Sequence, residues 1–208
     1  MGFLNKLFGK KTDSANSDKG HKEKWDFYLT NIDDKPGSIM VDLGLISIAP
    51  IQDNETLVWV SVKMNNPKEN GLSTSGEIET LGQIEESLVA KLNKKHNCIF
   101  AGRATTDGNR DFYFYFSDTT LYDKSISEAM VQFPKYNYDF GTKADKDWKS
   151  YFDFLYPLPK QLQSIQNRNV VEQLENNGDK LKKPRQVDHW IYFKSEGDRK
   201  KLQPLFIT

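Results

Sequence analysis

The order of strand-like and helix-like segments between residues 57 and 141 restricts the fold more than any other feature of the sequence. An almost continuous apolar run at Leu57–Met64 predicts a central strand. The segment Glu77–Lys95 carries an apolar stripe at helical spacing and predicts a helix. Two strands, a helix and a strand are then expected at 98–105, 111–117, 120–133 and 136–141. The resulting β-α-β-β-α-β order is the ferredoxin-like motif, so we predict an α+β fold.

The strand expected at 111–117 has aromatic side chains on both of its faces. Strands that are apolar on both faces are buried on both. We expect the helices to cover one face, and the N-terminal strands or the segment around Trp148 to cover the other. The hairpin between this strand and the preceding one is predicted from Asp107-Gly108-Asn109, because Gly and Asn tolerate positive φ.

Segments before and after this core extend the predicted fold. Two extra N-terminal strands are expected at 25–29 and 38–48. Helices are expected at 145–154, 162–177 and 196–205, with a strand at 187–193. The last part is an α-β-α unit, which is a partial ferredoxin-like unit, so either the chain has been shortened or this unit packs on the first domain or on another copy. A homo-oligomer formed through this incomplete unit is therefore one expectation.

The expected domains are a flexible segment at 1–24, a ferredoxin-like domain at 25–157 and a partial domain at 158–208. In the first segment, Phe3, Leu4, Leu7 and Phe8 recur at helical spacing among lysines. This pattern fits an amphipathic helix that touches a membrane or a partner. It also fits a frayed terminus and linker, which we favour because so short a helix is marginal in water.

Composition excludes several classes of protein. The chain has 29 Lys+Arg and 29 Asp+Glu, so no basic excess points to a nucleic-acid or membrane partner. The single cysteine, Cys98, lies in an apolar run and is expected to be an inert buried thiol. No apolar stretch is long enough to span a bilayer, and the N-terminus lacks the pattern of a signal peptide. A cytoplasmic location is therefore expected.

Two stretches resemble known families. Trp25-Asp26-Phe27-Tyr28, Leu57-Val58-Trp59-Val60, Arg110 to Tyr115 and Tyr151 to Pro157 resemble the bacterial domain of unknown function DUF695. From about residue 162 to 208, Leu174 to Asp179 and Pro184 to Phe193 are similar to the N-terminal half of RraB, an inhibitor of ribonuclease E. The second resemblance implies a protein that binds an RNA-degrading enzyme and alters its activity. The second half of that domain and its acidic tail have no counterpart in this sequence.

No catalytic motif is found in the sequence, and no cofactor is expected. His21, His96 and His189 stand far apart without the spacing of metal ligands, so no metal site is predicted. His189 is interpreted as a half-exposed strand residue, with a contact or proton-carrying role as the alternative. A hydrolase built from the scattered acids Asp107, Asp111 and Asp118 is a further alternative, although their spacing gives no opposed pair of carboxylates.

An aromatic constellation on the first domain gives a binding alternative. Arg110, Phe112 and Phe114 match the spacing of the third strand of RNA-recognition motifs, whose aromatic rings stack on bases. Trp59 occupies the place of a second stacking ring on the first strand. Asp111 and the tyrosine that follows Phe112 replace the small residues that let RNA approach. The alternative function is therefore RNA or nucleotide binding by this sheet.

The leading hypothesis is a non-catalytic regulator or adaptor that acts by protein–protein contact, with an RNA-degrading enzyme as the implied partner. The expected contact surface lies around Arg185, Asp188, His189 and Trp190, because mixed polar and aromatic patches suit interfaces. This hypothesis predicts that replacing Trp190 with alanine abolishes partner binding.

Overall fold

The computed structural model describes residues 21–182 and 192–202. The chain divides into two compact units, residues 1–172 and 173–208, and the division falls inside helix α4 (Pro159–Asn176). The boundary expected from the sequence lies between residues 157 and 158. The structure assigns the first turns of α4 to the first unit, where Ile165 is buried in the core and Arg168 pairs with Asp26.

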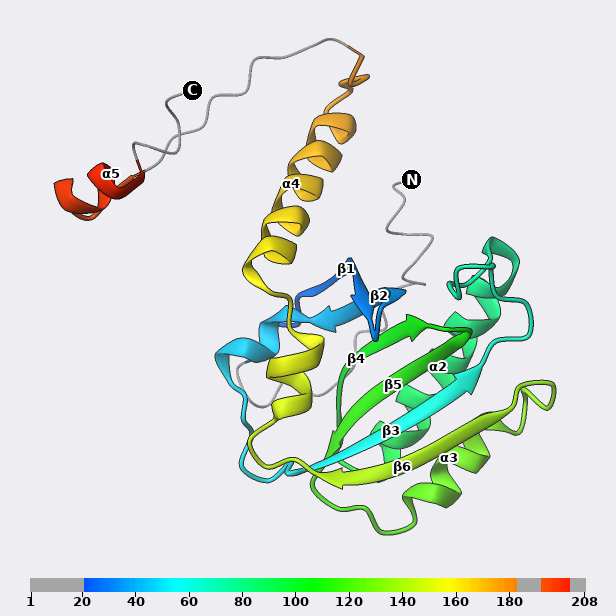
Figure 1. Cartoon of the computed structure of the whole chain (residues 1–208). Coiled ribbons are helices and arrows are strands. Elements are labelled where there is room, and N and C mark those ends of the chain that lie inside the picture. Colours follow the sequence, from blue (N-terminus) through cyan, green and yellow to red (C-terminus); the bar gives the residue numbers. More distant parts are fainter. Residues whose placement is uncertain (1–20, 183–191, 203–208) are drawn as a thin grey trace. The chain divides into compact units, whose positions relative to one another are not determined.

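The first unit is an α+β structure whose elements follow the order expected from the sequence (Figure 1). Its strands are β1 (Trp25–Ile32), β2 (Lys35–Asp42), β3 (Thr56–Lys63), β4 (Ile99–Thr106), β5 (Asn109–Phe116) and β6 (Tyr138–Ala144). Its helices are the 3-10 helix η1 (Leu43–Ser47), α2 (Ser75–Lys95), α3 (Tyr122–Met130), the π-helix η2 (Ser150–Leu155) and the first part of α4. In the second unit, the short helix α5 (Glu196–Leu202) begins where it was predicted.

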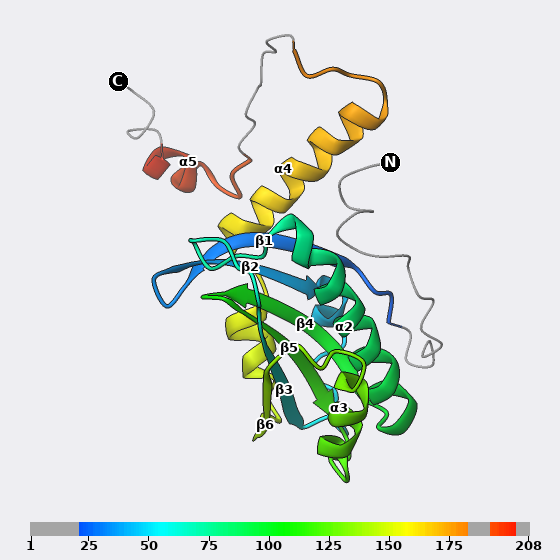
Figure 2. The same ribbon diagram turned by 90° about the vertical axis from the view of Figure 1, so that its right-hand side faces the viewer.

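The strands form one six-stranded sheet in the order β1-β2-β4-β5-β3-β6, and every neighbouring pair is antiparallel. Helices α2 and α3 cover one face of the sheet, and η2 lies on the other (Figures 1 and 2). Two hydrophobic clusters fill the two interfaces. The outermost strands are β1 at one end and β6 at the other.

Strand β5 is buried on both faces, as the sequence predicted. Phe112, Phe114 and Phe116 point into the cluster beneath α2 and α3. Tyr115 points into the opposite cluster, where its ring stacks on Trp148 with centroids 3.8 Å apart and planes 5° apart. The Trp148 segment is therefore one of the two covers that were anticipated, and it lies directly on β5.

The predicted strand 38–48 ends earlier than expected, at Asp42, and this expectation was wrong for residues 43–47. The pairing of β2 with β4 stops at Val41, and the Asp42 side chain accepts a hydrogen bond from the Gly44 backbone nitrogen at 2.9 Å. An aspartate that accepts from the second following amide caps a helical turn. The β-branched and apolar residues after Asp42 therefore form η1 instead of extending the strand.

The predicted helix 145–154 is also only partly confirmed, because η2 begins at Ser150. Asp145 instead opens a turn in which Trp148 takes a left-handed backbone conformation, with φ of 54°. This conformation is uncommon for a non-glycine residue. The indole it positions is fully buried and donates from Nε1 to the Asn54 carbonyl at 2.7 Å, which accounts for the interruption.

Other expectations are confirmed by local geometry. The β4–β5 turn has positive φ at Asp107 and Gly108, 48° and 77°. Cys98 is buried, donates to Asn93 Oδ1 at 3.0 Å, and has a pKa raised by burial. The strand expected at 187–193 falls mainly outside the described residues. Within the ranges that the structure describes, no helix is both long and apolar enough to cross a membrane.

Candidate functional site

The structure does not bring the predicted base-stacking residues onto one surface. In the β3–β5 register, Val58 faces Phe114 and Val60 faces Phe112, so these two phenylalanines share the face covered by α2 and α3. Both rings are fully buried. Trp59 is one residue out of phase and lies on the opposite face of the sheet. The combined stacking surface of Trp59, Phe112 and Phe114 was therefore a wrong prediction.

Arg110, the fourth member of that set, is a buried cation that ties a loop to the sheet. Its Nε donates to Thr105 Oγ1 at 3.0 Å and its Nη2 to Ser73 Oγ at 3.3 Å. Burial, with the nearby positive charge of Arg103, lowers the pKa of Arg110 to about 9. The guanidinium thus stays charged at neutral pH. Its donors are directed to protein groups and away from solvent.

The remaining predicted residues lie apart from one another. Asp107 occupies the β4–β5 turn and pairs with Lys35, whereas Asp118 follows the far end of β5. Asp111 lies in between on β5, with a side chain near Ser61 and a pKa raised by burial. An eight-residue strand is about 25 Å long, so these acids cannot share one substrate. Arg185, Asp188, His189 and Trp190 lie outside the described residues.

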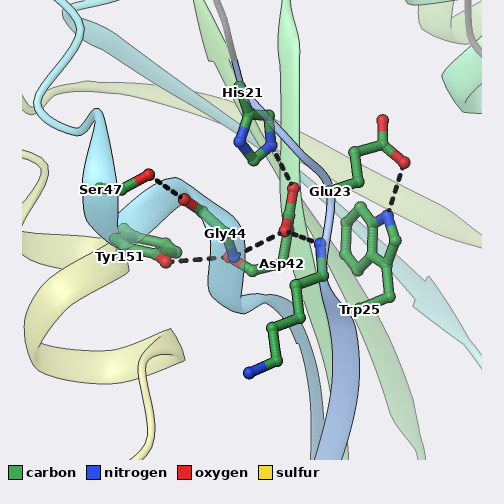
Figure 3. Close-up of polar contacts among 8 residues, drawn as sticks. His21, Glu23, Trp25, Asp42, Gly44, Ser47 and Tyr151 are labelled. Atoms are coloured by element: carbon green, nitrogen blue, oxygen red, sulfur yellow. Dashed lines mark hydrogen bonds and ion pairs between the residues drawn. The ribbon is translucent and has the colours of Figure 1, made fainter.

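A concentrated polar site in the first unit is centred on Asp42, at the junction of β2 and η1 (Figure 3). Asp42 is 2% exposed. Its Oδ1 accepts the backbone amides of Lys24 and Gly44 at 2.8 and 2.9 Å. Its Oδ2 lies 2.7 Å from Nε2 of His21. This carboxylate therefore joins the segment before β1 to the end of β2.

A tyrosine from η2 completes the Asp42 site. The Tyr151 hydroxyl donates to the Asp42 carbonyl oxygen at 2.9 Å (Figure 3). Burial and the negative charge of Asp42 raise the pKa of Tyr151, which keeps the hydroxyl protonated as a donor. Segments more than a hundred residues apart in the chain are thereby fastened to one residue.

Close packing at Gly44 fixes the approach of the N-terminal segment. A Cβ at this position would lie 2.2 Å from the Lys22 carbonyl oxygen and 2.8 Å from Cε1 of His21. Both contacts are shorter than any stable nonbonded separation, so glycine is required where the two backbones meet. The site was not predicted from the sequence, because Asp42 fell inside a predicted strand. The Asp42-Leu43-Gly44 spacing was the signal that could have revealed the cap.

The His21–Asp42 pair has the composition of a base with its orienting acid, but its geometry supports a structural role. In catalytic triads the second imidazole nitrogen faces the nucleophile. Here Nδ1 of His21 is buried and has no hydrogen-bond partner. Both carboxylate oxygens of Asp42 are already occupied. Within residues 21–182 and 192–202, no group of three or more His, Cys, Asp or Glu side chains could hold a metal ion.

Comparisons with known families confirm both predicted resemblances. The model of a family described as "Family of unknown function (DUF695)" matches residues 23–156, which includes the whole six-stranded sheet. The model described as "Regulator of ribonuclease activity B" (RraB) matches residues 164–204, beginning inside α4. The comparison with curated proteins gives no match, and neither does the comparison with solved structures.

Proposed function

The chain belongs to the DUF695 family, and we propose that it uses this domain as a scaffold for an RraB-like segment that contacts and regulates a ribonuclease. The observation that carries the proposal is the RraB match at residues 164–204. A regulator named for its effect on ribonuclease activity acts through protein contact, so no catalytic site of its own is required. This function requires the chain to share the ribonuclease's compartment, and we therefore propose a cytoplasmic location.

Helix α4 supports the proposal because its two sides differ where the RraB match begins. On one side, Ile165 is buried in the core, and Arg168 pairs with Asp26 and lies 4.1 Å from the centroid of the Phe27 ring. Val170 and Val171 on the same helix are 57% and 42% exposed. The helix is thus anchored to the DUF695 sheet while it presents two valines to solvent.

The proposed contacts are of two kinds: these valines in the first unit and, considered separately, the residues selected from the sequence in the second unit. Exposed β-branched residues on an anchored helix lose little conformational freedom on binding, which favours their use at an interface. Arg185, Asp188, His189 and Trp190 follow within the same RraB match. Arginine and tryptophan are the residue types enriched among the energetically dominant contacts of interfaces.

We also infer that the DUF695 scaffold is ferredoxin-like. Elements β3-α2-β4-β5-α3-β6 give strands in the order β4-β5-β3-β6, with antiparallel neighbours and both helices on one face. This is the arrangement of the split βαβ motif. Strands β1 and β2 extend it at the β4 edge.

Purified components test the proposed function directly. The full chain is added to a ribonuclease E-type endonuclease and a labelled RNA, and both binding and the cleavage rate are measured. We expect direct binding and a concentration-dependent change in cleavage. The W190A variant and the double variant V170S/V171S should each weaken binding at least about tenfold, the loss expected when a dominant contact is removed.

A matched control lies at the end of α3, just outside the helix. Val131 directly follows that helix and is 75% exposed, so V131S introduces the same chemical change outside the RraB match and should bind as the wild type does. Unchanged binding by both W190A and V170S/V171S would contradict the proposed surface. Binding of the full chain to the RNA alone, with none to the endonuclease, would contradict the proposed function and favour the RNA-binding alternative.

A further inference from the structure

We propose that two copies of this chain pair through their β6 strands, so that the two sheets join into one continuous sheet. Strand β6 is the last strand of the described sheet and is hydrogen-bonded to β3 alone (Figure 1). An edge strand presents a row of unpaired backbone groups that a second chain can pair with. The pairing uses only the first unit and stands apart from the proposed function.

Two backbone hydrogen bonds show which groups of β6 point outward. The Lys63 amide donates to the Asn137 carbonyl at 2.9 Å, and the Asp145 amide donates to the Glu55 carbonyl at 2.8 Å. These bonds lie just outside the two ends of the β3–β6 ladder, and they show which residues of β6 are hydrogen-bonded to β3. Because hydrogen-bonded positions alternate along an antiparallel strand, the odd-numbered residues of β6 bond to β3. The even-numbered residues, Tyr138 to Ala144, therefore direct their amides and carbonyls outward.

One of these outward amides is bonded to a side chain instead of to a neighbouring strand. The Phe140 backbone nitrogen donates to Oδ1 of the adjacent Asp139 at 2.8 Å. Lys143, on the same face of the strand as Asp139, reaches only Ser150 Oγ, at 3.2 Å. Asp139 and Lys143 are both exposed, so each can exchange its local contact for a partner at little cost in desolvation.

Charge complementarity selects the second copy as the partner and fixes the register. An antiparallel pair with Gly141 facing Gly141 at the two-fold axis places Asp139 opposite the partner's Lys143, and Lys143 opposite the partner's Asp139. These are non-hydrogen-bonded positions, where facing Cα atoms are about 4.5 Å apart and side chains interact most strongly. The outward groups of Phe140 and Thr142 then bond across the axis, as do those of Tyr138 and Ala144.

Neighbouring registers that keep the same backbone phase lose this match. Centring the axis on Phe140 leaves Asp139 opposite Gly141. Centring it on Thr142 places Asp139 opposite the partner's Asp145, and like charges that face each other are destabilising. Gly141 also leaves the axis free of side chains, and Trp59 packs over it so closely that a Cβ there would lie 2.7 Å from the indole.

Sedimentation equilibrium of the full chain and a set of charge variants tests the pairing. The wild type should dimerise, and D139K and K143D should each weaken dimerisation at least about tenfold, because each creates two like-charged pairs. The swap D139K/K143D should restore the dimer, and an equimolar mixture of D139K with K143D should form heterodimers. These two rescues distinguish a lost interface from a misfolded variant.

Two further variants complete the test. T142P removes an amide that points outward and leaves the β3–β6 bonds intact, so it should give a monomer with an unchanged far-UV spectrum. D107K reverses an exposed charge in the β4–β5 turn, which is not part of β6, and should dimerise as the wild type does. A wild type that is still monomeric at about 100 μM would overturn the proposal, because a dimer with a Kd of about 1 μM would be almost fully formed at that concentration. A dimer that persists in D139K, K143D and T142P alike would also overturn it.

Discussion

Replacing Asp42 with alanine should destabilise the first unit more than any other single change at the site in Figure 3. The carboxylate accepts two backbone amides and contacts His21, all between 2.7 and 2.9 Å. Removing it would leave the Lys24 and Gly44 amides without their acceptor in a site where Asp42 is 2% exposed. Tyr151 bonds to the backbone carbonyl, so that contact survives the substitution.

The magnitude follows from these contacts. Loss of a helix cap costs about 1 kcal/mol, and each buried hydrogen bond to a charged group contributes about 1.5–3 kcal/mol. His21 is 16% exposed and regains water, so its bond counts at the low end of that range. Together we expect D42A to lower the free energy of unfolding by about 4–5 kcal/mol. A domain of this size loses roughly 2–4 °C of Tm per kcal/mol, so Tm should fall by about 10 °C.

Urea unfolding of the full chain, followed by far-UV circular dichroism, measures the change. D42N retains an acceptor for the two amides and should lose only about 1 kcal/mol, whereas H21A, which removes a single charged partner, should lose about 1.5 kcal/mol. D118A is the control, because Asp118 likewise accepts from the second following amide but is exposed, and its variant should keep the wild-type midpoint. A D42A protein within about 0.5 kcal/mol of the wild type, the range of ordinary surface substitutions, would refute the structural reasoning.

Two other changes test the charges on β1 and β5. R168M keeps the side-chain stem but leaves Asp26, which is 7% exposed, without its cation. We expect this variant to lower the free energy of unfolding, measured in urea, by about 2 kcal/mol. R168K should recover part of that loss, and equal stability of all three proteins would contradict the pairing. D111N should stabilise the chain by about 1 kcal/mol at pH 7, because one oxygen of Asp111 is buried without a hydrogen-bond partner. Burial raises the folded-state pKa of Asp111, so the wild type loses stability relative to D111N as pH rises through that pKa, and the advantage of D111N should shrink toward pH 4. A D111N advantage that is the same at both pH values would count against the burial of the charge.

Local patterns in the sequence were enough to predict most of the strands and helices of the first unit, because apolar periodicity and turn residues act over a few positions. The run of alternating aromatics in β5 even indicated burial on both faces. The sequence did not predict which residues of neighbouring strands face each other. Placing Trp59 beside Phe112 and Phe114 required the β3–β5 register, and a shift of one residue moves a side chain to the opposite face.

The Asp42 site escaped prediction for a different physical reason. Its partners come from the segment before β1, from the start of η1 and from η2, so no short stretch of sequence contains the site. The same holds for Trp148, whose left-handed φ is stabilised by a bond to Asn54 and a stack on Tyr115. Both features interrupt elements that propensity alone would continue, because tertiary contacts outweigh the local preference.

The way the first unit uses its polar side chains indicates where a partner can bind without loss of stability. Asp42 and Asp145 each accept two backbone amides, Glu77 accepts those of Asn65 and Asn66, and Arg110 donates to two side chains of neighbouring segments. A ligand that took any of these groups would first break contacts that hold distant segments together. The outward groups of β6 and the exposed valines of α4 carry no such obligation, so contact there displaces only the exposed local contacts of Asp139 and Lys143. Energetics therefore favours binding at the edge of the sheet and along α4 over binding at these buried polar groups.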